Sequence, residues 1–211
     1  MSDSTTASSA AQAAFRNPFA SLVPQRKANR DGDVQVHLHA HRLQSVVLIS
    51  TWMGGTQGLC TALAQAMATT DLFALPETTG HTAPCALGLL MRTGPHEFML
   101  VGDGAPPLDS LCGCITLDVG SVLDLSHARC RVHVQGPKAV EALGKLFALD
   151  FRDAAFPPGQ VKLTGHHHVP CSIHRIGPAN FDVYMLSTYA RGQLESLQDA
   201  ALEYGVELVL G

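Results

Sequence analysis

The sequence predicts an α+β protein made of two ferredoxin-like halves, each with the element order β-α-β-β-α-β. Three observations support this prediction. Residues 128–135 alternate between apolar and polar side chains, as in a half-buried strand, and lead through Gly136 and Pro137 into an amphipathic helical stretch. The same order of strands and helices recurs in the other half of the chain. The segment Arg-Thr-Gly-Pro-His-Glu-Phe from Arg92 has a counterpart, Arg-Ile-Gly-Pro-Ala-Asn-Phe, from Arg175.

Length and composition restrict the class of protein. At 211 residues, of which 46% are hydrophobic, the chain can form one domain of generous size or two small ones. A formal net charge of −4 provides no basic field for nucleic acid. No apolar run approaches the roughly 20 residues that span a bilayer, and the N-terminus lacks the pattern of a signal peptide. We therefore expect a cytoplasmic protein without membrane or nucleic-acid partners.

Residues 1–30 are rich in Ser, Thr, Ala and Gln, which predicts a flexible N-terminal tail. Its apolar cluster either folds back on its own domain or lies on a partner subunit. The cluster consists of Phe15, Pro18, Phe19, Leu22 and Val23. We expect the tail to pack on a partner, with Phe15, Pro18, Phe19 and Leu22 as candidate contacts. Residues 31–211 are expected to form a single domain of two pseudo-repeats, about 34–125 and 126–211.

The first repeat is expected to contain one clear helix, with Thr56 as its N-cap. Its inner stripe is Leu59, Leu63, Ala66 and Met67. The other elements, in order, are a buried strand over 46–50, a turn at Gly54-Gly55, a loop over 69–83, strands over 85–92 and 96–101 around Gly94-Pro95, a helical turn within 104–111 and an extended stretch over 115–125.

The second repeat follows the same order. Pro137 is expected at the first helical position, and Gly205 at the C′ position that ends the last helix. That last helix should turn Tyr189, Leu194, Leu197 and Ala201 inward. The elements are a strand over 128–135, a helix over 137–147, extended segments over 161–164 and 169–175, a corner at Gly177-Pro178, a strand over 181–186, a helix over 188–204 and a strand over 206–210.

Two groups of histidines raise the question of a metal site. On a strand, His37, His39 and His41 share one face, and three imidazoles can hold a metal ion. No acidic residue or cysteine stands beside them in sequence, so a solvated strand face is expected. The triplet 166–168 follows a glycine in a connection between strands, which favours an exposed loop. The six cysteines, including the Cys-x-Cys pair at 112 and 114, lack disulfide or zinc spacing and are expected to be free.

An enzyme needs a nucleophile with a base, a metal or a cofactor cradle. The chain has neither a Gly-x-Ser-x-Gly elbow nor a His-Glu-x-x-His motif. Ser126 and His127 point to opposite faces of a strand, which excludes them as a direct nucleophile–base pair. Asp118 and Asp124 share a face, but the sequence indicates no pocket around them. We therefore expect no catalytic, cofactor-binding or metal-binding residue in this chain.

Three segments carry a resemblance to a known family. The stretch 124–139, Asp-Leu-Ser-His-Ala-Arg-Cys-Arg-Val-His-Val-Gln-Gly-Pro-Lys-Ala, with Leu143 and Leu146 behind it, resembles the aminomethyltransferase-like module of folate-associated proteins. Residues 94–100, Gly-Pro-His-Glu-Phe-Met-Leu, are similar to the Gly-Pro-Asp-Glu-Trp-Leu-Leu box of the gamma subunit of heterotetrameric sarcosine oxidase. Leu149-Asp150 and the Phe-Pro-Pro-Gly at 156–159 are similar to its Leu-Asp…Phe-Pro-Pro-Gly segment. The resemblance covers roughly residues 34–210.

The resemblance implies an aminomethyltransferase-like fold of the folate-binding superfamily and a structural, non-catalytic role. A gamma subunit of this family assembles with alpha, beta and delta subunits, chiefly with the large alpha subunit. The complex oxidatively demethylates sarcosine, or another N-methyl amino acid in sister enzymes such as N-methylglutamate dehydrogenase. The resemblance places FAD, FMN, NAD, zinc and tetrahydrofolate in the partner subunits and none in this chain.

Two departures from the family box leave the branch of the family open. His96 stands where Asp is usual and Phe98 where Trp is usual, which keeps a polar corner and a buried aromatic. The alternative is a stand-alone folate-binding or aminomethyl-transferring protein, because the shared module also occurs there. Against this alternative, the Lys-Gly-Cys-Tyr box of the folate-binding iron–sulfur assembly proteins is absent.

Overall fold

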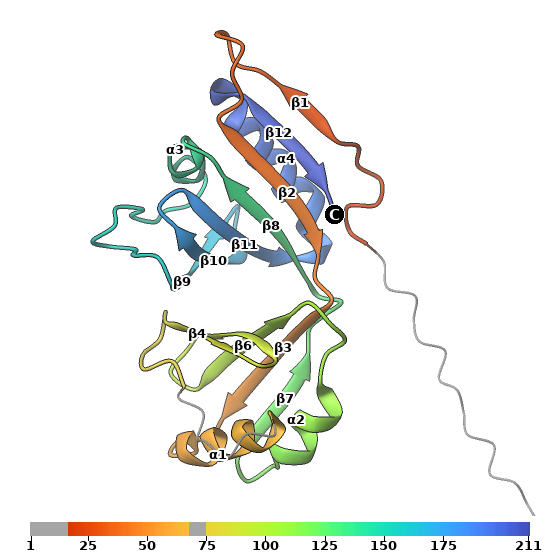
Figure 1. The fold of residues 1–211 in the computed structure, drawn as a ribbon, viewed down its shortest axis with the longest axis vertical. Coiled ribbons are helices and arrows are strands. Elements are labelled where there is room, and N and C mark those ends of the chain that lie inside the picture. The colour runs from red at the N-terminus through yellow and green to blue at the C-terminus, as the bar shows by residue number, and fades with distance from the viewer. Residues whose placement is uncertain (1–16, 68–74) are drawn as a thin grey trace, which may run out of the picture.

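The computed structural model describes residues 17–67 and 75–211. Two β-sheets form two lobes, and each sheet carries a pair of helices on one face (Figure 1). The two helices of each pair contact each other. No helix in these two ranges is long and apolar enough to cross a membrane.

The N-terminal lobe is a five-stranded sheet with the order β4-β5-β6-β3-β7. All of its paired strands are antiparallel. Its elements are β3 (Ser45–Thr51), α1 (Thr56–Ala66), β4 (Thr82–Cys85), β5 (Gly88–Arg92), β6 (Glu97–Gly102), α2 (Leu108–Cys114) and β7 (Gly120–Asp124).

The C-terminal lobe is a seven-stranded sheet with the order β1-β12-β2-β8-β11-β10-β9. Two of its strands, β1 (Gln25–Lys27) and β2 (Val36–Arg42), come from the N-terminal part of the chain. The other elements are β8 (Arg129–Gln135), α3 (Ala139–Gly144), β9 (Gln160–His166), β10 (Val169–Gly177), β11 (Asn180–Leu186), α4 (Ala190–Ala201) between the short 3-10 helices η1 (Ser187–Tyr189) and η2 (Leu202–Tyr204), and β12 (Val206–Leu210).

The two sheets repeat one topology. Without β1 and β2, the C-terminal sheet reads β9-β10-β11-β8-β12, which matches β4-β5-β6-β3-β7 strand for strand. Numbered along the chain, the last four strands of each series have the spatial order 2-3-1-4 of a ferredoxin-like unit, and β4 or β9 is added at the edge. The fold class expected from the sequence is therefore confirmed, with one extra edge strand in each half.

β2 is the main departure from a plain duplication. It lies between β8 and β12, antiparallel to β8 and parallel to β12, whereas the equivalent strands β3 and β7 pair directly. β2 lies within the range expected for the first repeat, about 34–125, but it pairs with strands of the second repeat. We propose that the first repeat begins at Ser45, since β2 completes the sheet of the second.

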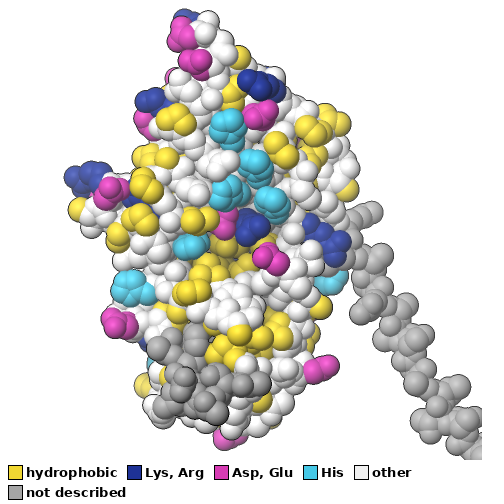
Figure 2. Space-filling model, in the orientation of Figure 1, with side chains coloured by type: hydrophobic (Ala, Val, Ile, Leu, Met, Phe, Trp, Pro, Cys, Tyr) yellow, Lys and Arg dark blue, Asp and Glu magenta, His cyan; other side chains and the backbone are white. Residues whose placement is uncertain are grey.

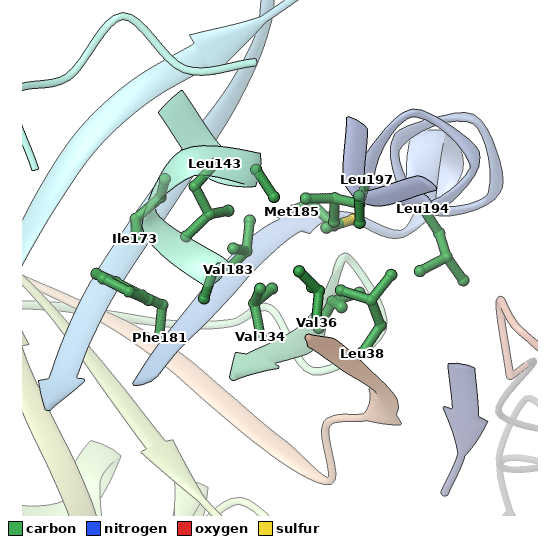
Figure 3. Packing of buried hydrophobic residues seen from close by; sticks show 14 of the residues in the cluster. Val36, Leu38, Val134, Leu143, Ile173, Phe181, Val183, Met185, Leu194 and Leu197 are labelled. Atoms are coloured by element: carbon green, nitrogen blue, oxygen red, sulfur yellow. The ribbon is translucent and has the colours of Figure 1, made fainter. Parts of the chain in front are cut away.

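The core of the C-terminal lobe lies between its sheet and the helices α3 and α4. Alternate residues of β2 and β8 point to this side, because side chains of a strand alternate between its two faces. Figure 3 shows Leu143 of α3 and Leu194 and Leu197 of α4 lying over side chains of the central strands. The labelled sheet residues are Val36, Leu38, Val134, Ile173, Phe181, Val183 and Met185.

The two lobes are joined by a small apolar cluster and by a strand contact. Val46 and Met99 of the N-terminal sheet belong to one buried cluster with Val161 and Tyr184 of the C-terminal sheet. The edge strand β9 also meets the segment before β4, where the Val161 amide donates to the Gly80 carbonyl over 2.7 Å. These contacts fix one lobe against the other.

Several local expectations are wrong in detail. The N-cap of α1 is Gly55 rather than Thr56, and a Cβ built on Gly55 would lie 2.4 Å from Thr51 Oγ1, so only glycine fits there. The helix α3 starts at Ala139, two residues after Pro137. Tyr189 is 54% exposed because it ends the 3-10 turn before α4, which shifts its direction away from the stripe of that helix.

The predicted strand over 85–92 is in fact two strands. A turn at 86–87 separates β4 from β5, and the hairpin of β5 and β6 around Gly94-Pro95 is as expected. Gly88 follows this turn with a φ of 132°, and a Cβ there would lie 2.1 Å from the Val101 carbonyl. The close approach of β6 therefore requires glycine at a position where the sequence suggests an uninterrupted strand.

Candidate functional site

The apolar cluster of the N-terminal tail divides into buried and exposed members. Phe19 is 1% exposed and lies in the core of the C-terminal lobe, and Leu22 packs against the same core. Pro18 is half-buried, whereas Val23 is 63% exposed. Phe15 lies outside the described residues. Phe19 and Leu22 therefore pack on their own domain, which was one of the two arrangements considered for this cluster.

The most distinctive polar surface lies on the opposite side of the C-terminal sheet from its helices. We call it the histidine face and define it as His37, His39, His41, Arg131 and His133. The period-2 alternation of β2 and β8 turns all five side chains to this side, since Val36, Leu38 and their neighbours occupy the other. Figure 2 shows histidine side chains gathered over these strands.

Strand register brings the members of the histidine face side by side. His39 is paired with His133, and His41 with Arg131. The ring centroids of His39 and His133 are 6.1 Å apart, and those of His39 and His41 are 6.3 Å apart. The pairing of β2 with β8 therefore brings together side chains that are about 90 residues apart in the chain.

Two carboxylates flank the histidine face, although the sequence around β2 offers none. His133 Nδ1 is 2.7 Å from Asp182 Oδ1, and Arg131 lies 3.5 Å from the same carboxylate. On the other side, His37 Nδ1 is 3.1 Å from Glu207 Oε2. Sequence reasoning missed both acids because they lie on β11 and β12, far from β2 in the chain. Only the strand order could have revealed them.

The carboxylate of Asp182 is buried and ionised. Burial alone would raise its pKa, but the hydrogen bond from His133 and the charges of Arg131, His133 and His174 outweigh burial and hold the pKa below its ordinary value. Tyr184 also donates to Asp182, over 3.3 Å. Asp182 thus fixes the positions of the basic side chains that surround it.

His39 and His41 differ from their neighbours because neither forms a salt bridge with a carboxylate in the described part of the chain. Burial lowers the pKa of His39, and the charges of His133 and His37 lower it further. Burial likewise lowers the pKa of His41, and Arg131 adds to the effect. These two imidazoles therefore favour the neutral form at neutral pH.

Neither histidine group forms a metal site within residues 17–67 and 75–211, where no set of three or more His, Cys, Asp or Glu side chains could hold a metal ion. The triplet does not converge. His166 is buried and hydrogen-bonds Gln193 over 2.9 Å, whereas His167 and His168 occupy an exposed hairpin turn. All six cysteines are free, and Cys130 and Cys171 are buried.

The other residues considered for chemistry have local structural roles. Ser126 Oγ donates to Asp124 Oδ1 over 2.6 Å and accepts from the Val46 amide, so it closes the end of β7. Asp118 accepts from the Thr116 hydroxyl. The two carboxylates are used separately within their own turns and do not form a pair.

Three gamma subunits of sarcosine oxidase are similar to this chain in sequence. No protein-family model matches the chain. The sarcosine oxidase gamma subunit of Corynebacterium sp. strain U-96 is 28% identical over 152 residues, which cover 63% of this chain and 74% of the relative. The gamma subunits of Corynebacterium sp. strain P-1 and of an Arthrobacter species are also 28% identical, over 70% and 68% of this chain and 72% and 70% of their own lengths.

Solved structures agree with these relatives. A chain of the heterotetrameric sarcosine oxidase from Corynebacterium sp. U-96, in complex with pyrrole 2-carboxylate, superposes with a TM-score of 0.70 and 26% identity, over 80% of this chain and 85% of that one. Aminomethyltransferase T of the glycine cleavage system from Bartonella henselae shares the fold, with a TM-score of 0.53, 19% identity and coverage of 83% and 48%. The resemblance to sarcosine oxidase gamma subunits, and the aminomethyltransferase-like fold, are thereby confirmed.

Proposed function

We propose that this chain is a structural, non-catalytic accessory subunit of a heterotetrameric, flavin-dependent complex of the sarcosine oxidase type. One observation carries the proposal: the likeness to sarcosine oxidase gamma subunits extends over most of this chain and of each relative, in sequence and in fold. The complex would oxidatively demethylate an N-methyl amino acid such as sarcosine, in the cytoplasm.

In this proposal the partners are alpha, beta and delta subunits, and the large alpha subunit provides the main contact. FAD, FMN, NAD, zinc and tetrahydrofolate would be bound by those partners. The arrangement of polar groups supports this division of labour, because Asp182, the buried carboxylate beside the histidine face, is engaged in ion pairs with Arg131 and His133. The tail would contribute the half-buried Pro18 and the exposed Val23 to a partner surface.

The second candidate is a stand-alone folate-binding or aminomethyl-transferring protein. Its support is the fold shared with the Bartonella henselae aminomethyltransferase, of which this chain covers 48%. Isothermal titration of the purified chain with tetrahydrofolate separates the two candidates. Micromolar affinity would favour the second candidate, whereas the accessory-subunit proposal expects no heat of binding.

The main test is a gentle affinity purification of the tagged chain from its native cells, read by absorbance and mass spectrometry. We expect a yellow, flavin-containing complex with three unlike chains. A colourless chain that elutes alone would contradict the proposal. Val23→Asp should lower the yield of the complex, because it places a charge on an exposed apolar side chain of the tail. Leu163→Asp, at a similarly exposed position of the edge strand β9, is the matched control.

A further inference from the structure

The histidine face gathers four histidines and one arginine, side chains that can carry positive charge, on a chain whose formal net charge is −4. With the flanking groups, it forms rows across the sheet. One row runs from Arg26 through Glu207 and His37 to Gln135, and the next from Val209 through His39 and His133 to Asp182. His41 and Arg131 begin a third row. Adjacent to the second row, His174 is buried beside Asp182.

The carboxylates on this surface are already engaged. Glu207 interacts with Arg26 and His37, and Asp182 with Arg131 and His133. His39 lies in the row next to that of Glu207 and His37, and His41 lies in the row of Arg131. His39 Nε2 lies 3.4 Å from the side-chain amide nitrogen of Gln135, and the ring of His41 stacks on that of His39. The surface therefore holds more groups that can carry positive charge than carboxylates to pair with them.

We propose that the histidine face is a docking surface for a carboxylate-rich segment of a partner protein, and that His39 and His41 take up protons when it binds. The inference rests on the proposed function, in which this chain assembles with other subunits, and it names one surface and one chemistry for that assembly.

Charge complementarity favours a carboxylate-rich segment at the histidine face. A carboxylate placed over His39 and His41 would supply the opposite charge that this part of the surface lacks. The side chains that can carry positive charge extend from Arg26 on β1 to Arg131 and His133 on β8, which is about 14 Å at the usual strand spacing. A small anion covers only a fraction of that length, whereas an extended segment of several residues spans it. Val209, 40% exposed in the row of His39, adds an apolar contact for the same segment.

Proton uptake follows from the surroundings of the two imidazoles. In the free chain, burial lowers the pKa of His39 and His41, and the neighbouring basic side chains Arg131, His37 and His133 lower it further, whereas Asp182 and Glu207 raise it by less. A bound carboxylate reverses this balance. Binding must then strengthen as the pH falls, by up to about tenfold per pH unit for each proton taken up.

The first test uses the full chain and a synthetic octaglutamate peptide, titrated by calorimetry at pH 6 and pH 8 in two buffers of different ionisation enthalpy. We expect tighter binding at pH 6, and a heat that depends on the buffer because protons are taken up. His39→Gln/His41→Gln should remove the pH dependence and weaken binding at pH 6 about tenfold. His39→Arg/His41→Arg should bind equally at both pH values, and His96→Gln, an exposed histidine of the other lobe, should behave as the wild type.

Several results would overturn the proposal. One is a failure of the peptide to bind at either pH, and another is wild-type affinity in the His39→Gln/His41→Gln chain. Inorganic phosphate that displaces the peptide at equal concentration would indicate a small-anion site. Stoichiometric Zn²⁺ binding that the double variant abolishes would indicate a metal site instead.

The affinity purification separates this proposal from the proposed function. If wild-type chain brings down three partner chains, His39→Gln/His41→Gln should bring down several-fold less, and an equal yield would remove the docking surface while leaving the subunit assignment intact. If neither chain brings down partners, the proposed function fails, and the octaglutamate titration still decides whether the histidine face binds carboxylates.

Discussion

Arg92 on β5 and Arg175 on β10 occupy equivalent positions in the two lobes, and their guanidinium groups make the same two contacts. Each lies 5.4 Å from the ring centroid of a phenylalanine on the next strand, Phe98 for the first and Phe181 for the second. Each also donates to the carbonyl of the proline in the intervening Gly-Pro corner, over 2.7 Å and 2.8 Å. The repeated Arg-x-Gly-Pro-x-x-Phe segment is therefore a repeated clamp between a corner and its two strands.

The two clamps should differ in what they contribute to stability. Arg175 is 2% exposed and also donates to the carbonyls of Phe151 and Phe156 and to Asp153. Arg175→Met leaves the buried carbonyls of Phe151 and Phe156 unpaired and should lower the free energy of unfolding by about 3–5 kcal/mol. Arg92 is only half-buried, so Arg92→Met should cost about 1–2 kcal/mol. Urea denaturation monitored by circular dichroism measures both values.

Arg191→Gln serves as the control for these arginines, because Arg191 is exposed and contacts only Glu195 one turn away on α4. It should change the free energy of unfolding by less than about 0.5 kcal/mol. If Arg175→Met were as mild as this control, the buried clamp would have no part in holding the loop before β9.

The same segment explains why the duplicated fold was predictable. Period-2 alternation, Gly-Pro corners and the repeated Arg…Phe spacing are local signals, and the elements they define match the observed strands closely. The extra strand β4 and the N-cap at Gly55 were missed because both depend on close approach by distant backbone or side-chain atoms. The insertion of β2 between β8 and β12 is a property of the sheet order, which no local pattern encodes.

Asp182 should make stability depend on pH in acid. Because its pKa is lowered in the folded state, its contribution is complete above the unfolded pKa near 3.9 and is lost as the pH falls through the folded value. Asp182→Asn should therefore lower the free energy of unfolding at pH 7 on the order of 3 kcal/mol, with the difference from wild type narrowing below about pH 4. Urea titrations at pH 7, 5 and 3 test this dependence.

A matched carboxylate variant keeps this prediction specific. Asp103 is exposed in the loop after β6, so Asp103→Asn should follow the wild-type stability at every pH. A deficit of Asp182→Asn that stayed constant down to pH 3 would mean that the loss comes from the replaced hydrogen-bond acceptor and not from the charge of Asp182.

Cysteine reactivity should follow burial. Burial raises the pKa of the Cys130 thiol to about 12, and it also raises the pKa of Cys171, so both thiols stay protonated and covered. Cys112 is exposed at the C-terminal part of α2. Brief treatment of the folded chain with iodoacetamide at pH 8 should label Cys112 first and leave Cys130 and Cys171 unmodified.

Peptide mass spectrometry reads this labelling position by position. The control is the same treatment in guanidinium chloride, where all six cysteines should react. Rapid labelling of Cys130 in the folded chain would contradict its burial against β11 and the helices.

The candidate site was harder to predict than the fold. The shared face of His37, His39 and His41 follows from alternation alone and was expected. Their acidic neighbours Asp182 and Glu207 were not, because each comes to the face through a strand pairing between distant parts of the chain. A prediction from sequence could assign the histidines to a surface but could not determine which of them would lack a carboxylate partner.

The hairpin turn between β9 and β10 offers a last test, because two histidines occupy backbone conformations that suit other residues. His167 and His168 have φ values of 49° and 64°, and they connect strands paired up to His166 and Val169, as in a two-residue turn of type I′. Asn and Gly adopt this region with less strain, so His167→Asn/His168→Gly should raise the free energy of unfolding by about 1 kcal/mol.

Thermal unfolding measures the gain in stability of this variant, and affinity purification in parallel measures its assembly with partner chains. A stabilised variant that assembles normally would show that the two histidines serve only the turn, whereas a stabilised variant that loses its partners would assign this turn to a subunit contact.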